Sequence, residues 1–454
     1  DCRSALAEAE VEYMDKQSHS IDVKFEVSPQ SIESVFESFQ VKGIQEVHFV
    51  IWTTTPWTIP SNVAVCIHEE IEYVLVRGGN ANFIIAKDLM DACSERWDLE
   101  LEILGSALGK DIKNISMKHP LYKRESKLLH GDHVTTESGT GCVHTAPAHG
   151  LDDYFICIKH GLESVKALDN RGLFREEYGP LSGLSTKKGD PIVIELLEKN
   201  EALLASKAYD HSYPHCWRHK SPVIFMSTPQ WFISMKKSGL IDGAINAVTN
   251  VNWEPSWGEE RILSMLEDRP DWCISRQRNW GVPITLIIHN ETGEVHPKQN
   301  LLFNQIADVI EEEGIEGWDN LELDTLIDDA ESYSKVHDTL DVWFDSGVTH
   351  MCVLDKLYGA DVIADLYLEG SDQHRGWFQS SLLTGIATNG MAPYRSVLTH
   401  GFVVDEEGRK QSKSLGNTIS PQKVWDTLGA DILRLWIAST DFRREMLASD
   451  EIFK

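Results

Sequence analysis

The strongest constraint on the fold is an alternation of strand and helix patterns between residues 364 and 402. Residues 364–368 and 397–402 are short runs typical of strands. Between them, residues 370–376 form a polar turn bounded by glycines, and residues 377–388 have the pattern of a helix. A strand, a helix and a second strand in succession predict a parallel α/β sheet. Ligands of such sheets bind beyond the carboxyl ends of the strands.

A second pattern, short strands separated by Gly, Asn and Pro, covers residues 41–205 and predicts a compact β-rich domain. The strands expected there are residues 47–52, 63–65, 73–76 and 83–85. The expected helices are residues 87–96 and 191–204, the second with Pro191 in its first turn. Further helices are expected at residues 256–267 and 302–313.

Composition narrows the class of protein. The chain has 454 residues, enough for two to four domains at roughly 100–200 residues each. Its 42 Lys and Arg against 71 Asp and Glu give a formal charge of −29, which argues against a broadly basic nucleic-acid surface but not against a local basic groove. No apolar run reaches the roughly 18–20 residues of a membrane span, so no membrane partner is expected. The eight cysteines form no C-x-x-C pair, which predicts reduced thiols and a cytoplasmic location.

Two polar clusters lie in the β-rich part. Residues 53–62 combine threonines at a strand end with a proline-bracketed turn and Asn62. Their hydroxyl groups could bind a polar ligand, although a threonine-rich strand end explains this stretch alone better. Residues 139–154 contain two histidines and two aspartates. A Ser/His/Asp hydrolase, a metal site and a structural turn fit these residue types, but G-x-S-x-G and H-E-x-x-H spacings are absent from the sequence.

Three further clusters lie nearer the C-terminal end. Residues 341–347 combine aspartates with aromatic residues, and residues 367–378 crowd acidic, amide and imidazole groups at a strand-to-helix turn. A helix N-terminus there would favour an anion such as phosphate. Residues 408–417 place three cations and two hydroxyl groups between glycines. This loop is a candidate phosphate cradle, with a solvated surface run as the alternative.

Taken together, these clusters resemble a known family. Residues 410–414, Lys-Gln-Ser-Lys-Ser, look like the KMSKS signature loop of class I aminoacyl-tRNA synthetases, with Gln411 where Met usually stands. In combination with residues 275–281, 341–347 and 367–378, the loop resembles isoleucyl-tRNA synthetases rather than valyl, leucyl or methionyl ones. The two polar clusters of the β-rich part resemble the editing-pocket motifs of the same family.

The resemblance implies an α/β fold, in which a large β-rich editing domain is inserted into a Rossmann-type catalytic domain with a parallel sheet. Only the second half of the catalytic domain is expected in this chain. The implied segments are residues 1–40 as a junction with the catalytic domain, 41–205 as the inserted editing domain, 206–340 as a connective segment, 341–400 as the catalytic half, and 401–454 as the signature loop and the start of a region that contacts the tRNA stem.

The resemblance also implies roles for individual residues in activating isoleucine. Lys410 and Lys413 would be catalytic, with Lys413 stabilising the phosphate charge that develops as pyrophosphate leaves. Trp343 and Trp377 would border the isoleucine side chain. The adenylate and ATP would be bound by Glu369, Gly370, Asp372, Gln373 and His374, together with Lys413. The implied reactants and partners are ATP with Mg²⁺, isoleucine and tRNA(Ile), and the protein is expected to be a monomer.

A second, hydrolytic site is implied because one methylene group discriminates weakly between valine and isoleucine. Asp153 would anchor the α-ammonium group of a mischarged valyl ester, and a positioned water would hydrolyse it. The matching pocket positions are Thr53, Thr54, Thr55, Asn62, His144 and Asp153.

Two expectations concern what the sequence lacks. Cys216 and His219 lie in a segment that carries zinc ligands in some relatives, and Cys2 could contribute, but two ligands fall short of the four of a structural zinc site, so no metal is expected. The H-x-G-H signature of the family is absent from these 454 residues. We therefore expect an internal portion of a synthetase that is incomplete for aminoacylation, with a freestanding editing deacylase or a non-catalytic tRNA-binding protein as the alternatives.

Overall fold

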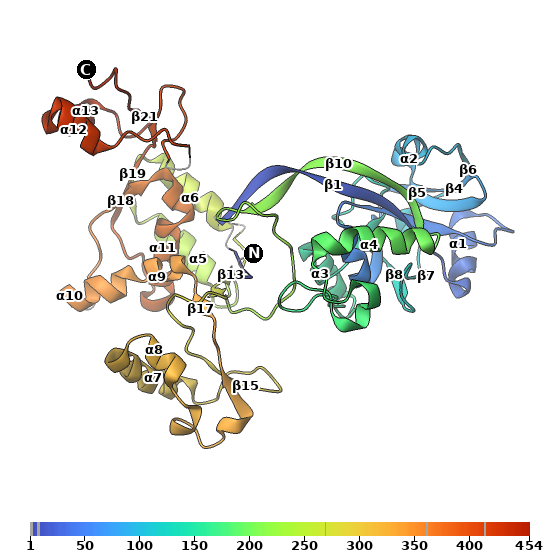
Figure 1. The fold of residues 1–454 in the computed structure, drawn as a ribbon, viewed down its shortest axis with the longest axis horizontal. Helices are drawn as coiled ribbons and strands as arrows, with labels where there is room; N and C mark the ends of the chain where they lie inside the picture. The colour runs from blue at the N-terminus through green and yellow to red at the C-terminus, as the bar shows by residue number, and fades with distance from the viewer. Residues whose placement is uncertain (1–2, 7–9, 268, 360–361, 413–414) are drawn as a thin grey trace. The chain divides into compact units, whose positions relative to one another are not determined.

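The computed structural model describes residues 3–6, 10–267, 269–359, 362–412 and 415–454 (Figure 1). The chain divides into two compact units. Unit 1 comprises residues 1–3 and 10–229, and unit 2 comprises residues 4–9 and 230–454. Lys413 and Cys2, two of the residues singled out above, lie outside the described residues.

Unit 1 is built on two sheets. The larger has the strand order β10-β1-β2-β5-β4-β6, in which only the β2–β5 pair is parallel. The smaller has the order β7-β8-β3-β9. The strands are β1 (Val11–Glu26), β2 (His48–Thr53), β3 (Ala64–Ile67), β4 (Glu72–Gly78), β5 (Ala81–Ala86), β6 (Leu101–Leu108), β7 (Ser116–Lys118), β8 (Glu125–His130), β9 (Val143–Thr145) and β10 (Leu203–Cys216). The helices are α1 (Ile32–Phe39), α2 (Met90–Trp97), α3 (Leu151–Lys159) and α4 (Thr186–Lys199).

The core of unit 1 explains why its strands form. Successive apolar residues of β2 and β4 are fully buried, among them Val50, Ile51, Val74 and Leu75. Strands that are buried on both faces have nearly continuous apolar sequences, and such runs are the signal from which the sequence predicts β2 and β4. The four strands expected from the sequence are present as β2, β3, β4 and β5, and the expected helix at residues 87–96 is present as a short 3₁₀ turn followed by α2.

The long ribbon of β1 and β10 is absent from the sequence prediction (Figure 1). Most residues of both strands are exposed or half-buried, so their sequences show no alternation of apolar and polar residues. Their antiparallel pairing, from Val11 opposite Cys216 onward, satisfies the backbone instead. The helix predicted over residues 191–204 is displaced: α4 begins at Thr186 and β10 at Leu203, so Pro191 lies inside the helix rather than in its first turn.

Unit 2 contains the predicted parallel sheet. Strands β12 (Asn252–Glu254), β19 (Ser396–His400) and β18 (Tyr367–Gly370) are mutually parallel in the order β12-β19-β18. The helix α11 (Trp377–Asn389) connects β18 with β19, which confirms the strand–helix–strand prediction. The other helices packed in this core include α5 (Leu240–Val248), α6 (Trp257–Glu267) and α9 (Val342–Gly347), and α6 corresponds to the helix expected at residues 256–267.

Two smaller clusters complete unit 2. One contains α7 (Gln299–Glu313), which matches the expected helix at residues 302–313, with α8 (Glu316–Asn320), β15 (Ile287–His289) and β16 (Tyr333–Lys335). The other contains α12 (Pro421–Leu428), α13 (Ala430–Ser439), β20 (Val403–Val404) and β21 (Met446–Leu447). The remaining strands are β11 (Phe232–Ile233), β13 (Trp272–Cys273), β14 (Ser275–Arg276) and β17 (Thr339–Leu340). The remaining helical segments are α10 (Lys356–Tyr358), a π-helical turn at His350–Asp355, and 3₁₀ turns at Leu323–Thr325, Ala330–Ser332 and Ser371–Arg375.

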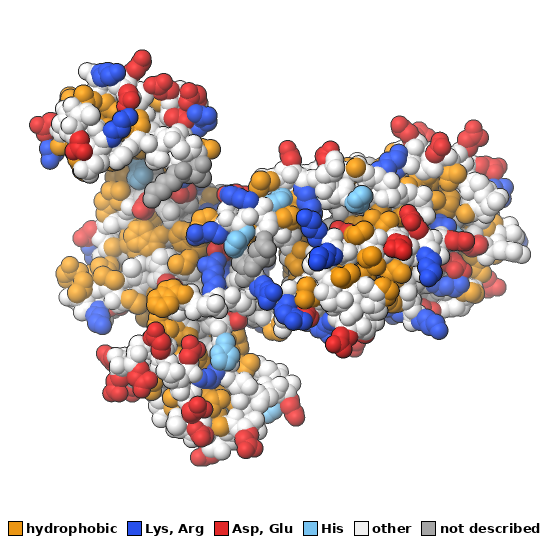
Figure 2. Space-filling model, in the orientation of Figure 1, with side chains coloured by type: hydrophobic (Ala, Val, Ile, Leu, Met, Phe, Trp, Pro, Cys, Tyr) orange, Lys and Arg blue, Asp and Glu red, His pale blue; other side chains and the backbone are white. Residues whose placement is uncertain are grey.

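Charge is unevenly distributed over unit 2. Figure 2 shows acidic side chains gathered over the segment of α7 and α8, where Glu311, Glu312, Glu313, Glu316 and Asp319 are all exposed. None of the helices in the described residues is both long and apolar enough to span a membrane.

Candidate functional site

The hydroxyl-rich segment of unit 1 folds back on itself where β2 ends. The backbone N–H of Thr55 donates to Thr53 Oγ1 at 3.1 Å, and the two hydroxyl oxygens are 3.2 Å apart. A 3₁₀ turn, Pro56–Ser61, follows, and within it Thr58 Oγ1 donates to the Thr55 carbonyl at 2.8 Å. Thr54 is half-buried between its two neighbours. The threonines are therefore held by local hydrogen bonds, not only by a strand end.

His144 joins this segment to Asn62. The pairing of β9 with β3 places His144 opposite Val65, close to the end of the 3₁₀ turn. Its Nε2 lies 3.0 Å from Thr58 Oγ1 and its Nδ1 lies 2.7 Å from Asn62 Nδ2. Burial, and then the neighbouring His149 and Arg124, lower the pKa of His144 to about 3. The ring is therefore neutral at physiological pH.

Asp153 lies beside this network on α3. Its Oδ2 accepts a hydrogen bond of 2.7 Å from the backbone N–H of Ala146, and a Cβ added at Gly150 would approach its carboxyl to 2.8 Å. Burial raises the pKa of Asp153 above its ordinary value. Among the described residues, no hydrogen bond links Asp153 directly to the threonines or His144. The structure thus connects Thr53, Thr55, Asn62 and His144 through Thr58 and leaves Asp153 on α3, outside this network.

Sequence reasoning did not select Thr58, and it missed two residues that reach this site from a third segment, Arg124 directly before β8 and Ser126 within it. Arg124 Nε donates to the Asn62 carbonyl at 3.1 Å and its Nη2 donates to the Pro60 carbonyl. The Ser126 hydroxyl donates to Asn62 Oδ1. In the sequence, Lys123-Arg124-Glu125 has the composition of a surface turn, and only the pairing of β8 with β3 brings it to the site.

In unit 2, the predicted adenylate residues lie at the carboxyl end of β18 and in the turn that follows it. Gln373 Oε1 accepts from the backbone N–H of Trp377 at 3.0 Å and so caps the start of α11. His374 is fully buried, with its Nδ1 3.1 Å from the Ser371 carbonyl, and burial lowers its pKa. Glu369 is exposed, and one of its carboxylate oxygens accepts from the N–H of Gly370 at 3.0 Å. Gln373 and His374 are therefore held in internal contacts, while Glu369 faces solvent.

The two tryptophans predicted to border an apolar substrate lie on neighbouring helices. Trp377 stacks on Tyr367 with ring centroids 4.0 Å apart and an interplanar angle of 10°. Its indole N–H donates to the Ser346 carbonyl at 3.0 Å, which ties α11 to α9. A Cβ added at Gly376 would come within 2.9 Å of the Trp343 ring. Glycine at this position lets the ring of Trp343 pack against the backbone at the start of α11.

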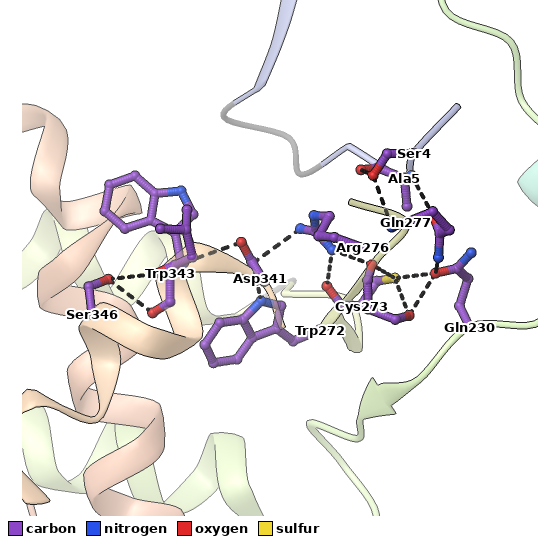
Figure 3. Close-up of polar contacts among 12 residues, drawn as sticks. Ser4, Ala5, Gln230, Trp272, Cys273, Arg276, Gln277, Asp341, Trp343 and Ser346 are labelled. Atoms are coloured by element: carbon purple, nitrogen blue, oxygen red, sulfur yellow. Dashed lines mark hydrogen bonds and ion pairs between the residues drawn. The ribbon is translucent and has the colours of Figure 1, made fainter. Parts of the chain in front are cut away.

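A buried ion pair lies at the start of α9, the helix that contains Trp343 (Figure 3). Arg276 Nη2 lies 3.1 Å from Asp341 Oδ2, and the two side chains are 2% and 3% exposed. Asp341 also accepts from the Trp272 indole at 2.9 Å and caps α9 through the N–H of Trp343 at 3.2 Å. Burial, and then the charge of Asp341, raises the pKa of Asp345 to about 6. The motifs at residues 275–281 and 341–347 are therefore one structural assembly.

The basic loop contains a cation close to the adenylate residues. Lys410 Nζ lies 3.7 Å from Asp372 Oδ2 and 3.7 Å above the centroid of the Phe402 ring. Gln411 bridges two segments: its Nε2 donates to the Ala448 carbonyl at 3.2 Å, and its Oε1 accepts from the N–H of Ile419 at 3.1 Å. A methionine side chain cannot form these two hydrogen bonds.

The described residues contain no group of three or more His, Cys, Asp and Glu side chains that could hold a metal ion. The pair considered from the sequence is close, with Cys216 Sγ 3.4 Å from His219 Nδ1.

Comparison with known proteins identifies relatives over nearly the full chain. The isoleucine–tRNA ligase of Pseudoalteromonas atlantica is 52% identical over 464 residues, covering 100% of this chain and 49% of the relative. That of Teredinibacter turnerae is 52% identical over 451 residues, covering 99% of this chain and 48% of the relative. The chain thus spans about half the length of the curated relatives that it matches.

Among solved structures, the crystal structure of GlLeuRS-CP1 matches 42% of this chain and 99% of that chain, with a TM-score of 0.35 and 15% identity. The ternary complex of Agrobacterium radiobacter K84 agnB2 LeuRS with tRNA and LeuAMS matches 97% of this chain and 47% of that chain, with a TM-score of 0.32 and 16% identity. Similarities at these scores support no conclusion. A family model described as tRNA synthetases class I (I, L, M and V) matches residues 1–449, and on that match the chain belongs to this family.

Proposed function

We propose that the chain is a portion of an isoleucine–tRNA ligase. The reaction is ATP-dependent activation of isoleucine and its transfer to tRNA(Ile), with hydrolytic editing of mischarged Val-tRNA(Ile). Identity of about half over the full chain with relatives named isoleucine–tRNA ligase supports this function over a freestanding deacylase or a non-catalytic binding protein. We assign the editing domain to residues 41–205 and the second half of the Rossmann-type catalytic domain to residues 341–400. The junction with the catalytic domain is then residues 1–40, and the connective segment is residues 206–340. The signature loop and the start of the stem-contact region are residues 401–454.

The observation that carries the editing assignment is the single hydrogen-bonded network formed by residues from two distant segments, both of which resemble editing-pocket motifs. Thr53, Thr55 and Asn62 come from one segment and His144 from the other. With Thr54, they line the pocket, and Asp153 anchors the α-ammonium group of the valyl ester. A water oxygen adds to the ester carbonyl carbon, the bond to the ribose oxygen breaks, and that oxygen takes up a proton. The products are valine and tRNA with a free 3′-terminal hydroxyl.

The assignment for isoleucine activation rests on unit 2. Trp343 and Trp377 border the isoleucine side chain, and Glu369, Gly370, Asp372, Gln373 and His374 line the adenylate. Lys410 and Lys413 act on the phosphates of ATP, which binds as its Mg²⁺ complex. The 3.7 Å approach of Lys410 to Asp372 supports a phosphate-binding role next to the adenylate residues. We assign the protein to the cytoplasm as a monomer.

The decisive experiment is deacylation of Val-tRNA(Ile) by this chain without ATP. Valine release is expected, with Ile-tRNA(Ile) spared, and Asp153→Ala and Thr55→Ala should each slow it strongly. Asp152→Ala is the matched control, because the neighbouring Asp152 side chain is exposed. Rates unchanged by Asp153→Ala and Thr55→Ala would reject the site assignment.

A further inference from the structure

The buried amide of Asn62 has only one orientation that satisfies its neighbours. Its Nδ2 lies 2.7 Å from the Ala64 carbonyl, and a carbonyl oxygen only accepts hydrogen bonds, so the amide nitrogen must face it. Its Oδ1 must then face Ser126, whose hydroxyl donates to it. Asn62 and Ser126 are both fully buried, so water does not compete for these contacts.

This orientation determines the tautomer of His144. The second N–H of Asn62 points at His144 Nδ1, 2.7 Å away, so Nδ1 accepts and carries no hydrogen. A neutral imidazole then carries its hydrogen on Nε2. Nε2 lies 3.0 Å from Thr58 Oγ1 and donates to it. The low pKa of His144, caused mainly by burial, keeps the ring in this neutral form.

The order of hydrogen bonds continues through Thr58. Its hydroxyl donates to the Thr55 carbonyl at 2.8 Å, and its oxygen accepts from His144. Both ring nitrogens of His144 are therefore engaged, and neither is available to take a proton from water. His144 acts on a ligand only through the residues that it holds.

The series extends from Thr58 to the other two threonines. Thr58 Oγ1 also lies 3.4 Å from Thr55 Oγ1, and because the Thr58 hydrogen is on the Thr55 carbonyl, the Thr55 hydroxyl is the donor in this contact. Thr53 Oγ1 lies 3.2 Å from Thr55 Oγ1, so the Thr53 hydroxyl donates to Thr55, while Thr53 Oγ1 accepts from the backbone N–H of Thr55. The tautomer of His144 therefore fixes the direction of the three threonine hydroxyl groups, and Thr53 Oγ1 keeps one lone pair for a hydrogen donor such as a water.

We propose that Ser126, acting through Asn62, and Thr58, in direct contact with the ring, are positioning residues that hold His144 in its Nε2–H tautomer and so fix the direction of the Thr53 and Thr55 hydroxyl groups. This inference rests on the proposed editing function for its role and on the hydrogen-bond geometry for its structure. Ser126 reaches the site because β8 alternates: Ser126 is buried, whereas the side chain of Lys127 is exposed.

The structural test measures the tautomer directly. In the full chain labelled with ¹⁵N-histidine, the His144 signals are assigned by comparison with His144→Asn. We expect protonated Nε2 and unprotonated Nδ1 at pH 7. Ser126→Ala removes one of the two contacts that orient the Asn62 amide, so a second tautomer should appear beside the first, whereas Ser126→Thr keeps the hydroxyl group and the single tautomer. A wild-type His144 that is protonated on Nδ1, or on both nitrogens, overturns the proposal.

The kinetic test uses the deacylation assay on the same variants. Ser126→Ala should lower kcat by about 10- to 100-fold, the effect of removing a partner that orients a functional histidine, with KM changed less than about threefold. Ser126→Thr should restore most of kcat, and Thr58→Val against Thr58→Ser provides a second pair in case the Ser126 variants fail to fold. Lys127→Ala controls for the strand. Unchanged kcat in Ser126→Ala and Thr58→Val overturns the proposal.

The two measurements separate this inference from the proposed function. A wild-type chain that shows the expected tautomer and no deacylation supports the hydrogen-bond order and rejects the editing function. A chain that deacylates Val-tRNA(Ile) with the other tautomer supports the function and rejects the inference.

Discussion

Replacing Asp341 by Asn tests a deeply buried ion pair. The change keeps the size of the side chain and leaves an oxygen that can accept from the backbone N–H of Trp343. It removes the negative charge that lies 3.1 Å from the Arg276 guanidinium, where the two side chains are 2% and 3% exposed, and it puts an N–H donor where Oδ2 accepts from the Trp272 indole. The Arg276 guanidinium then stays buried without the Asp341 carboxylate.

The expected magnitude follows from the burial. Removing one partner of a buried ion pair costs about 3–5 kcal/mol in the free energy of unfolding. Unit 2 also contains an exposed pair, Arg395 with Asp365, whose side chains are 64% and 88% exposed. Exposed pairs contribute about 0–1 kcal/mol, so Asp365→Asn is the matched control. We expect Asp341→Asn to destabilise unit 2 by several times as much as Asp365→Asn.

Hydrogen exchange followed by mass spectrometry measures the loss of stability in each unit separately. Peptides from α9 should exchange about 100-fold faster or more in Asp341→Asn, because each 1.4 kcal/mol is a factor of ten in an opening equilibrium. Peptides from β2, in unit 1, serve as the internal reference. If the two substitutions change exchange in α9 by the same factor, the buried pair does not stabilise unit 2 as argued.

Three further predictions concern other parts of the chain. Gln411→Met should speed amide hydrogen exchange in the peptide around residue 411 by about tenfold, because the variant loses two hydrogen bonds of about 0.5–1.5 kcal/mol each. Unchanged hydrogen exchange would contradict the bridging role of Gln411. Burial raises the pKa of Asp190 to about 6, so unit 1 should lose stability as pH rises from about 4 to 6. The urea midpoint of Asp190→Asn should fall less over this pH range than that of the wild-type chain, and an equal fall in both would refute the prediction. Gly141→Ala should destabilise unit 1 by at least about 1 kcal/mol more than Gly79→Ala in urea unfolding. Both glycines have positive φ, but only at Gly141 would the new Cβ meet Ala86, at 2.3 Å; equal effects would show that backbone strain alone matters.

The fold was predictable where burial imposes a simple pattern. The strand at residues 47–52 is apolar at every position except His48 because β2 is buried on both faces, and α11 follows a glycine-bounded turn as expected. The ribbon of β1 and β10 was not predictable, because its residues are mostly exposed and are ordered by pairing with each other across nearly 200 positions of sequence. Local patterns carry no information on such long-range pairing.

The site shows the same division. The threonines at residues 53–55 and His144 could be selected only through the resemblance to the family, since their residue types alone also fit a threonine-rich strand end and a structural turn. Arg124 and Ser126 could not, because an Arg between Lys and Glu and a Ser within a mixed strand are common at surfaces. Only the parallel pairing of β8 with β3 brings them to the backbone and side chain of Asn62.

The electrostatics of the proposed editing site favour a ligand that brings its own positive charge. His144 is neutral there, and the nearby Arg124 directs its guanidinium at backbone carbonyls. Burial raises the pKa of Asp153, which means that its carboxylate is poorly solvated. An α-ammonium group placed beside Asp153 would replace the missing solvation and lower that pKa again, so the carboxylate and the ligand stabilise each other's charge. An uncharged ester of the same size would gain no such stabilisation, and the site would therefore select an aminoacyl ester over a simple acyl ester.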